Sequence, residues 1–209
     1  MERIEYRTID TAAWGDGPWA TEPDKIQWPD EETGYPCLIV RNGQVGGFLC
    51  GYVGVPKGHP AYGLNYDGRT QENAEAMRQA YRKQMRDWDS SKGLEALPSL
   101  EVEREEPVPG IGEKIYNIEV HGGLTFSGPC HGDPEMESTG ICHKPSPGEP
   151  DDVWWYGFDT GHAWDYAPQI IYPGYEPRKL SDHCVYRDVA YVTAECQSLA
   201  KQLKAMETA

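Results

Sequence analysis

The sequence predicts a single α+β domain, with a mainly antiparallel sheet, two main helices at about 70–88 and 184–204, and long loops rich in glycine and proline. Its 209 residues suit one sizeable domain. Short strand-like runs bounded by turn signals alternate with two stretches of helical periodicity, and that order is typical of an α+β fold. The 23 glycines and 17 prolines indicate many irregular connections.

The first half of the chain predicts an irregular segment followed by a hairpin. Residues 1–36 carry three tryptophans among glycines, prolines and acids, so we expect this segment to wrap around the domain. Residues 37–41 read as a strand, and Asn42-Gly43 is a strong signal for a tight turn. Residues 45–55 then form the returning strand of the expected hairpin.

Helical periodicity begins near residue 70. The apolar stripe of the helix predicted at 70–88 consists of Ala74, Met77, Tyr81, Met85 and Trp88. Its opposite face is the most basic patch of the chain, with Arg78, Arg82, Lys83 and Arg86. Either a solvated helix surface or a site for an anionic ligand would explain this face.

The second half predicts strands at 98–104, 114–126 and 153–159. The second of these is interrupted by Gly122-Gly123, and the acidic stretch 127–152 reads as a long loop, of a kind that is often functional or mobile. Asp182 is the predicted N-cap of the last helix. The apolar stripe of that helix, which we expect to pack on the sheet, is Val189, Val192, Cys196, Leu199 and Leu203.

The charge of the chain argues against whole classes of partner. With 34 acidic and 19 basic residues, the net charge is −15, whereas binding to nucleic-acid backbones or anionic membranes requires basic patches. Neither a signal core nor an apolar run of membrane-spanning length is present, so we expect a cytoplasmic protein with six reduced cysteines. The acidic surface would serve for solubility or for docking onto a basic partner protein.

The most informative stretch runs from Trp154 to Asp165. An aromatic strand ends there in three polar residues spaced three apart, Asp159, His162 and Asp165. In a tight turn this spacing brings the side chains near one face. The trio could hold a divalent metal ion, or His162 could act as a general base oriented by the acids. A purely structural network that holds the loop is the third interpretation.

His121 is the expected partner of this trio, because it ends the strand predicted at 114–121. The amides of Gly122 and Gly123 would then receive an anionic group, beside Thr125. Trp155 and Trp164 could stack a base, although core packing would explain them as well. His121 meets Asp159 directly if the two strands are parallel, and only after the glycine turn if they are antiparallel.

A second constellation consists of the dyads Cys130-His131 and Cys142-His143 in the long loop. Four such ligands could hold a structural zinc ion. Adjacent cysteine and histidine seldom reach one ion together, however, and the spacing matches no standard zinc finger.

Four pieces of the chain together resemble a family of uncharacterised proteins encoded by phages and prophages. They are the hairpin from Gly47 to Pro56 with Gly58-His59-Pro60, the run from Val120 to Thr125, the run from Trp154 to Asp165, and the pattern from Tyr186 to Glu195 in the last helix. Residues 66–100 look like an insertion relative to that family. The resemblance implies a phage accessory role, for example against a host defence.

We therefore expect a small anionic or nucleotide-like ligand to bind at His121, Asp159, His162 and Asp165, with hydrolysis as a further possibility and a divalent metal as a candidate cofactor. The alternative is a non-catalytic acidic protein that blocks a basic host protein. A virion component is less favoured, because the chain lacks repeats and assembly arms.

Overall fold

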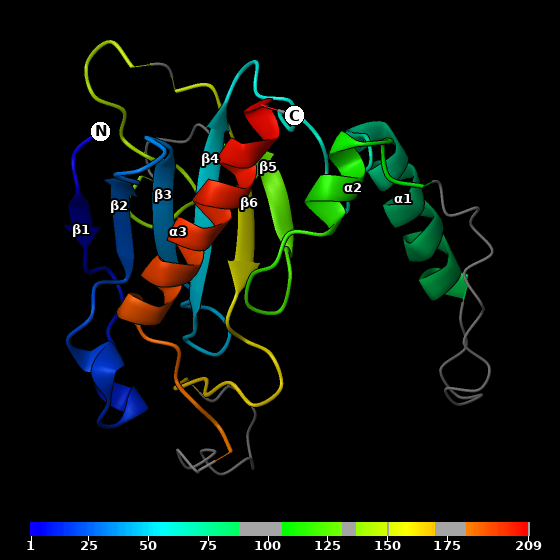
Figure 1. Cartoon of the computed structure of the whole chain (residues 1–209). Coiled ribbons are helices and arrows are strands. Elements are labelled where there is room, and N and C mark those ends of the chain that lie inside the picture. Colours follow the sequence, from blue (N-terminus) through cyan, green and yellow to red (C-terminus); the bar gives the residue numbers. More distant parts are fainter. Residues whose placement is uncertain (88–105, 131–136, 150, 170–182, 209) are drawn as a thin grey trace.

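A computed structural model of the chain describes residues 1–87, 106–130, 137–149, 151–169 and 183–208. Its centre is a six-stranded sheet in the order β1-β2-β3-β4-β6-β5 (Figure 1), and every neighbouring pair is antiparallel. The predicted α+β fold with an antiparallel sheet is confirmed. The strands are β1 (Ile4–Tyr6), β2 (Lys25–Pro29), β3 (Pro36–Arg41), β4 (Leu49–Pro56), β5 (Phe126–Pro129) and β6 (Val153–Asp159).

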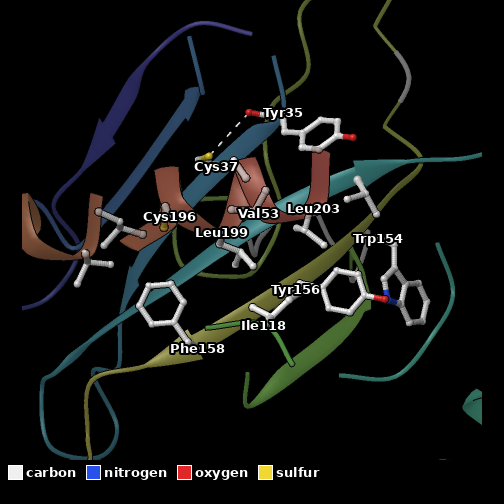
Figure 2. Close-up of a cluster of buried hydrophobic side chains, with 14 of the residues drawn as sticks. Tyr35, Cys37, Val53, Ile118, Trp154, Tyr156, Phe158, Cys196, Leu199 and Leu203 are labelled. Carbon is white, nitrogen blue, oxygen red and sulfur yellow. Dashed lines mark hydrogen bonds between the residues drawn. The ribbon is translucent and has the colours of Figure 1, made fainter. Parts of the chain in front are cut away.

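One face of the sheet packs against helix α3 (Val189–Ala205), which crosses the strands diagonally (Figure 1). Side chains alternate between the two faces along each strand. In β6, Trp154, Tyr156 and Phe158 join the main core with Leu199 and Leu203 of α3 (Figure 2), whereas Val153 and Trp155 belong to a smaller cluster with Leu38 and Tyr52. The sheet is therefore buried on both faces.

Helix α3 begins later than the sequence indicated. Its N-cap is Asp188, whose side chain accepts a hydrogen bond from the backbone N–H of Tyr191 at 2.8 Å. The predicted N-cap, Asp182, lies outside the described residues. Asp188 satisfies an otherwise unpaired amide of the first turn, and this fixes the start of the helix. The residues before Asp188 therefore lie outside the helix, and this segment carries residues of the site below.

The N-terminal segment is more regular than expected. Besides two short 3₁₀ helices, Ala12–Trp14 and Pro18–Ala20, residues 1–36 contain β1 and β2, so the prediction of a wholly irregular segment was wrong. The sequence did not indicate that β2 is a buried strand, because two of its buried residues, Lys25 and Gln27, are polar. They alternate with Ile26 and Trp28 of the main core.

The prediction of a strand at 114–126 was also wrong. Residues Ile111–Tyr116 form helix α2, a turn follows, and only Phe126–Pro129 forms a strand. Ile115 and Ile118 both contact the main core from this segment, a spacing of three that suits a helix and its C-terminal turn better than a strand. Helix α1 (Gln71–Asp87) agrees with the helix predicted at 70–88 and lies beside α2, beyond β5 (Figure 1). The strand predicted at 98–104 lies outside the described residues.

The loop after residue 136 covers the sheet face opposite α3. The buried amine of Lys25 donates to the carbonyl oxygens of Cys142, at 2.6 Å, and of Glu137. The backbone N–H of Lys144 donates to the side chain of Gln27 at 2.9 Å. These contacts explain why β2 places polar side chains on a buried face.

Cys130 and Cys142 form a disulfide, so the expectation that all six cysteines are reduced is wrong. A sulfur in a disulfide is not a thiolate, so these two residues do not supply ligands for the zinc site considered in the sequence. His143 lies buried against Trp155 with 5.5 Å between ring centroids, and His131 lies outside the described residues. Cys37, Cys50, Cys184 and Cys196 are free.

Candidate functional site

The site lies at the end of the sheet where β6 terminates. Three segments meet there: the turn after α2, the loop after β6, and the segment that leads into α3 (Figure 1). The strand predicted at 114–121 does not form, so neither of the two strand arrangements expected from the sequence applies. His121 lies in the turn that follows α2, and its ring contacts Asp165 rather than Asp159.

His121 is held by three hydrogen bonds. Its backbone N–H donates to Glu195 of α3 at 2.7 Å, its Nδ1 lies 3.0 Å from the hydroxyl of Tyr191, and its Nε2 lies 2.7 Å from Oδ2 of Asp165. Burial, together with the nearby Glu195 carboxylate, raises the pKa of Tyr191, so the phenol stays protonated at neutral pH. Both ring nitrogens of His121 are engaged, and the orientation of the imidazole is fixed.

Asp165 is the centre of the site and is only 5% exposed. Its Oδ1 accepts the Nε–H of Arg187 at 3.0 Å, and its Oδ2 accepts the backbone N–H of His162 at 3.2 Å in addition to the contact with His121. The guanidinium of Arg187 also stacks over the ring of Tyr191, 4.7 Å from its centroid. Arg187 therefore balances the charge of a buried carboxylate.

His162 differs from its neighbours because its Nδ1 is buried and yet has no hydrogen-bond partner among the residues that the structure describes. The nearest carboxylate oxygens, Oδ1 of Asp159 and Oδ2 of Asp165, each lie 3.8 Å away, too far for a hydrogen bond. About a third of the side chain, 35%, is exposed. An unpaired buried polar atom in a native protein calls for an explanation.

Gly122 sets the position of the His162 ring. Its φ of +67° lies in the left-handed region, and an added Cβ would stand 2.2 Å from Cε1 of His162. The glycine backbone therefore packs directly against the imidazole. The rings of His121 and His162 contact each other with 5.5 Å between centroids, on either side of the turn at Gly122.

The other residues predicted for the site divide into those near it and those away from it. Gly123 donates its N–H to the carbonyl of Val120 at 2.9 Å, so this amide does not receive an anion as expected. Thr125 is exposed and donates its backbone N–H to Gly157. Trp155 is fully buried in the smaller cluster on the face away from α3, so the expectation that it stacks a ligand is wrong.

Trp164 remains a candidate contact for a ligand, because it directly precedes Asp165 and is 68% exposed. Its φ of +76° makes it the one non-glycine residue with a positive φ in the described chain. Such strain persists only where surrounding structure enforces it. Here the N–H of Val185 donates to the carbonyl of Trp164 at 3.0 Å, and the N–H of Tyr166 donates to Val185.

Sequence reasoning missed Arg187, Tyr191 and Glu195 as site residues. Each belongs to the run from Tyr186 to Glu195 that carried the family resemblance, so the signal was present. This pattern did not indicate a shared site, because these residues follow Asp165 by 22 to 30 positions and are brought to the site only through the docking of α3.

No family model, curated protein or solved structure matches the chain. None of the helices in the described part of the chain has the length and apolar character needed to span a membrane. Two imidazoles, a buried carboxylate and a guanidinium within one network are suited to binding an anion, transferring a proton or holding a metal ion.

Proposed function

We propose that this site binds a small anionic, nucleotide-like ligand and hydrolyses it. The observation that carries the proposal is that Asp165 is contacted by two residues with free hydrogen-bonding capacity: a partly exposed guanidinium, and a histidine whose Nδ1 has no partner among the described residues. Arg187 donates its Nε–H to Asp165, and its terminal nitrogens make no hydrogen bond with the described residues, while 28% of the side chain is exposed. These nitrogens suit a phosphate or carboxylate group.

Trp164 supports a ligand with a planar ring. An exposed indole next to Asp165 in the chain suits base stacking, which contributes about 1–3 kcal/mol for each base in nucleic-acid-binding proteins. The ligand would then place its anionic group on Arg187 and its ring on Trp164. The side chain of His162 is partly exposed, and its Nδ1 has no partner among the described residues. In hydrolysis His162 would act as the general base or as a metal ligand.

Calorimetric titration with a panel of mononucleotides and dinucleotides tests this proposal. We expect at least one member to bind, and Arg187→Gln to weaken that binding by tenfold or more because it removes the charge. Arg3→Gln is the matched control, because Arg3 forms an exposed ion pair with Glu5. Failure of the whole panel to bind, or equal binding by Arg187→Gln, would overturn the proposal.

A non-catalytic role is the second candidate, favoured by the net charge of −15. An acidic surface could dock onto a basic groove of a host protein, as would suit a phage accessory protein that counters a host defence. Ionic strength separates the two candidates. A complex held by acidic docking weakens steeply with added salt, whereas binding in a small-ligand pocket is less sensitive.

A further inference from the structure

We propose that His121, His162 and Asp165 bind a divalent transition-metal ion, through Nε2, Nδ1 and Oδ2 respectively. One ligand atom from each of the three residues lies within 4.8 Å of the other two. The metal would supply the activated water for the hydrolysis proposed above, so its catalytic use rests on that function, whereas metal binding itself does not.

The distances around His162 are the first argument. Its Nδ1 is buried, has no hydrogen-bond partner among the described residues, and lies 3.8 Å from Oδ2 of Asp165. That separation is too long for a hydrogen bond, but it suits two ligands of one ion. Bonds of about 2.0–2.2 Å to each atom place the two ligand atoms roughly 3–4 Å apart.

The groups behind two of the three ligands, His121 and Asp165, are the second argument. A histidine that binds a metal through one nitrogen normally donates its other N–H to an acceptor, and a carboxylate ligand is normally held by a donor. The Nδ1 of His121 faces the hydroxyl of Tyr191 at 3.0 Å, and Oδ1 of Asp165 accepts from Arg187 at 3.0 Å. Both partners stand on the side away from the proposed ligand atoms.

Metal binding requires two changes: a proton moves within His121, and Nε2 of His121 and Oδ2 of Asp165, which lie 2.7 Å apart, separate to roughly 3–4 Å. Without the ion, Nε2 of His121 donates to Asp165 at 2.7 Å. When the ion takes that nitrogen, the neutral imidazole carries its proton on Nδ1, and the oxygen of Tyr191 accepts it. No proton is gained or lost, because the proton moves within one ring and Asp165 exchanges a hydrogen bond for a metal bond.

The ligand set indicates the class of ion. Two imidazoles and one carboxylate suit Zn²⁺, Fe²⁺ or Mn²⁺ better than Mg²⁺ or Ca²⁺, which prefer oxygen ligands. Three protein ligands also leave coordination positions for water and substrate, as in catalytic metal sites. The set expected from the sequence, Asp159, His162 and Asp165, changes by one member, because His121 takes the place of Asp159.

Titration of the purified full-length protein with Zn²⁺, and with Co²⁺ as a spectroscopic probe, tests the site without any organic ligand. We expect one equivalent to bind, and His121→Ala or His162→Ala to weaken binding at least 100-fold. His183→Ala, at an exposed histidine, is the control and keeps wild-type affinity. His162→Ala should stay folded, because no described residue bonds its Nδ1.

Asp159→Asn separates the two possible ligand sets. We expect it to change the metal affinity by less than tenfold, and a loss as large as that of His162→Ala would overturn the assignment of His121. Absence of binding by the wild type, or unchanged binding by His162→Ala, would overturn the site altogether. The Zn²⁺ titration contains no nucleotide, so the two proposals fail separately. Zn²⁺ binding by a protein that binds no nucleotide would overturn the nucleotide proposal alone, and nucleotide binding by a protein that binds no Zn²⁺ would overturn the metal site alone.

Discussion

Two polar clusters meet at the chain segment before α3, and they are built on opposite principles. Tyr186 belongs to the first, in which the fully buried Arg41 pairs with Asp24 at 2.9 Å and with Glu22 at 3.1 Å. Arg187, the next residue, belongs to the second, where it pairs with Asp165. Neighbouring residues thus serve two different networks.

In the Arg41 cluster each nitrogen of the guanidinium has a partner. Nε donates to Asp24, Nη1 donates to Gly47 and Tyr186, and Nη2 donates to Glu22.

The site around Asp165 leaves His162 Nδ1 unpaired among the described residues and exposes part of Arg187. Full pairing of the buried Arg41 suits a structural role, whereas the unpaired Nδ1 of His162 is the atom that we propose for a ligand.

The largest effect we predict concerns the structural cluster. Arg41→Met leaves Glu22 and Asp24 without their cation, and should lower the free energy of unfolding by roughly 3–5 kcal/mol. Urea denaturation measures this. Arg3→Met, at an exposed pair, is the control and should cost less than about 0.5 kcal/mol. Similar losses for both variants would contradict the comparison.

An intermediate effect is predicted at the turn between the two histidines. Gly122→Ala and Gly123→Ala both place a side chain at positive φ, so each should cost about 1 kcal/mol of stability. Only the Cβ at position 122 collides with His162, whereas nothing lies within 4 Å of a Cβ at position 123. We expect Gly122→Ala alone to weaken Zn²⁺ binding, by tenfold or more, in the same titration.

Equal loss of Zn²⁺ affinity in both glycine variants would mean that backbone strain, rather than the position of His162, controls the site.

The smallest effect that we predict concerns His59, whose two ring nitrogens are both bonded, in contrast to those of His162. His59 accepts the N–H of Ala61 on Nδ1 and contacts the carbonyl of Leu203 through Nε2. Burial lowers the pKa of His59, so the unfolded chain takes up its proton first as the pH falls. The stability contributed by His59 is present above about pH 6.5 and declines below it.

His59→Gln should therefore flatten the dependence of unfolding free energy on pH between 7 and 5, by a fraction of a kcal/mol. Denaturation midpoints at several pH values check this. An unchanged slope in the variant would show that His59 does not resist protonation in the fold.

The sequence allowed the fold class, β6 and both main helices to be predicted, because their apolar periodicity is strong. It misled at β2 and at 114–126. Lys25 and Gln27 face a covering loop that no local pattern reveals, and the isoleucines of α2 fit a strand as well as a helix. Asp159, His162 and Asp165 could be grouped from the sequence because they are close together in the chain, whereas Arg187 and Tyr191 meet Asp165 and His121 only through the packing of α3.

In our proposal, His121 and His162 together bind one metal ion. Long-range ¹H–¹⁵N spectra of the histidine side chains, recorded with and without Zn²⁺, are the sharpest test. We expect Nε2 of His121 and Nδ1 of His162 both to move to metal-bound shifts at one equivalent, while the other histidines keep theirs. Spectra in which neither nitrogen responds, or in which only one of the two does, would contradict it.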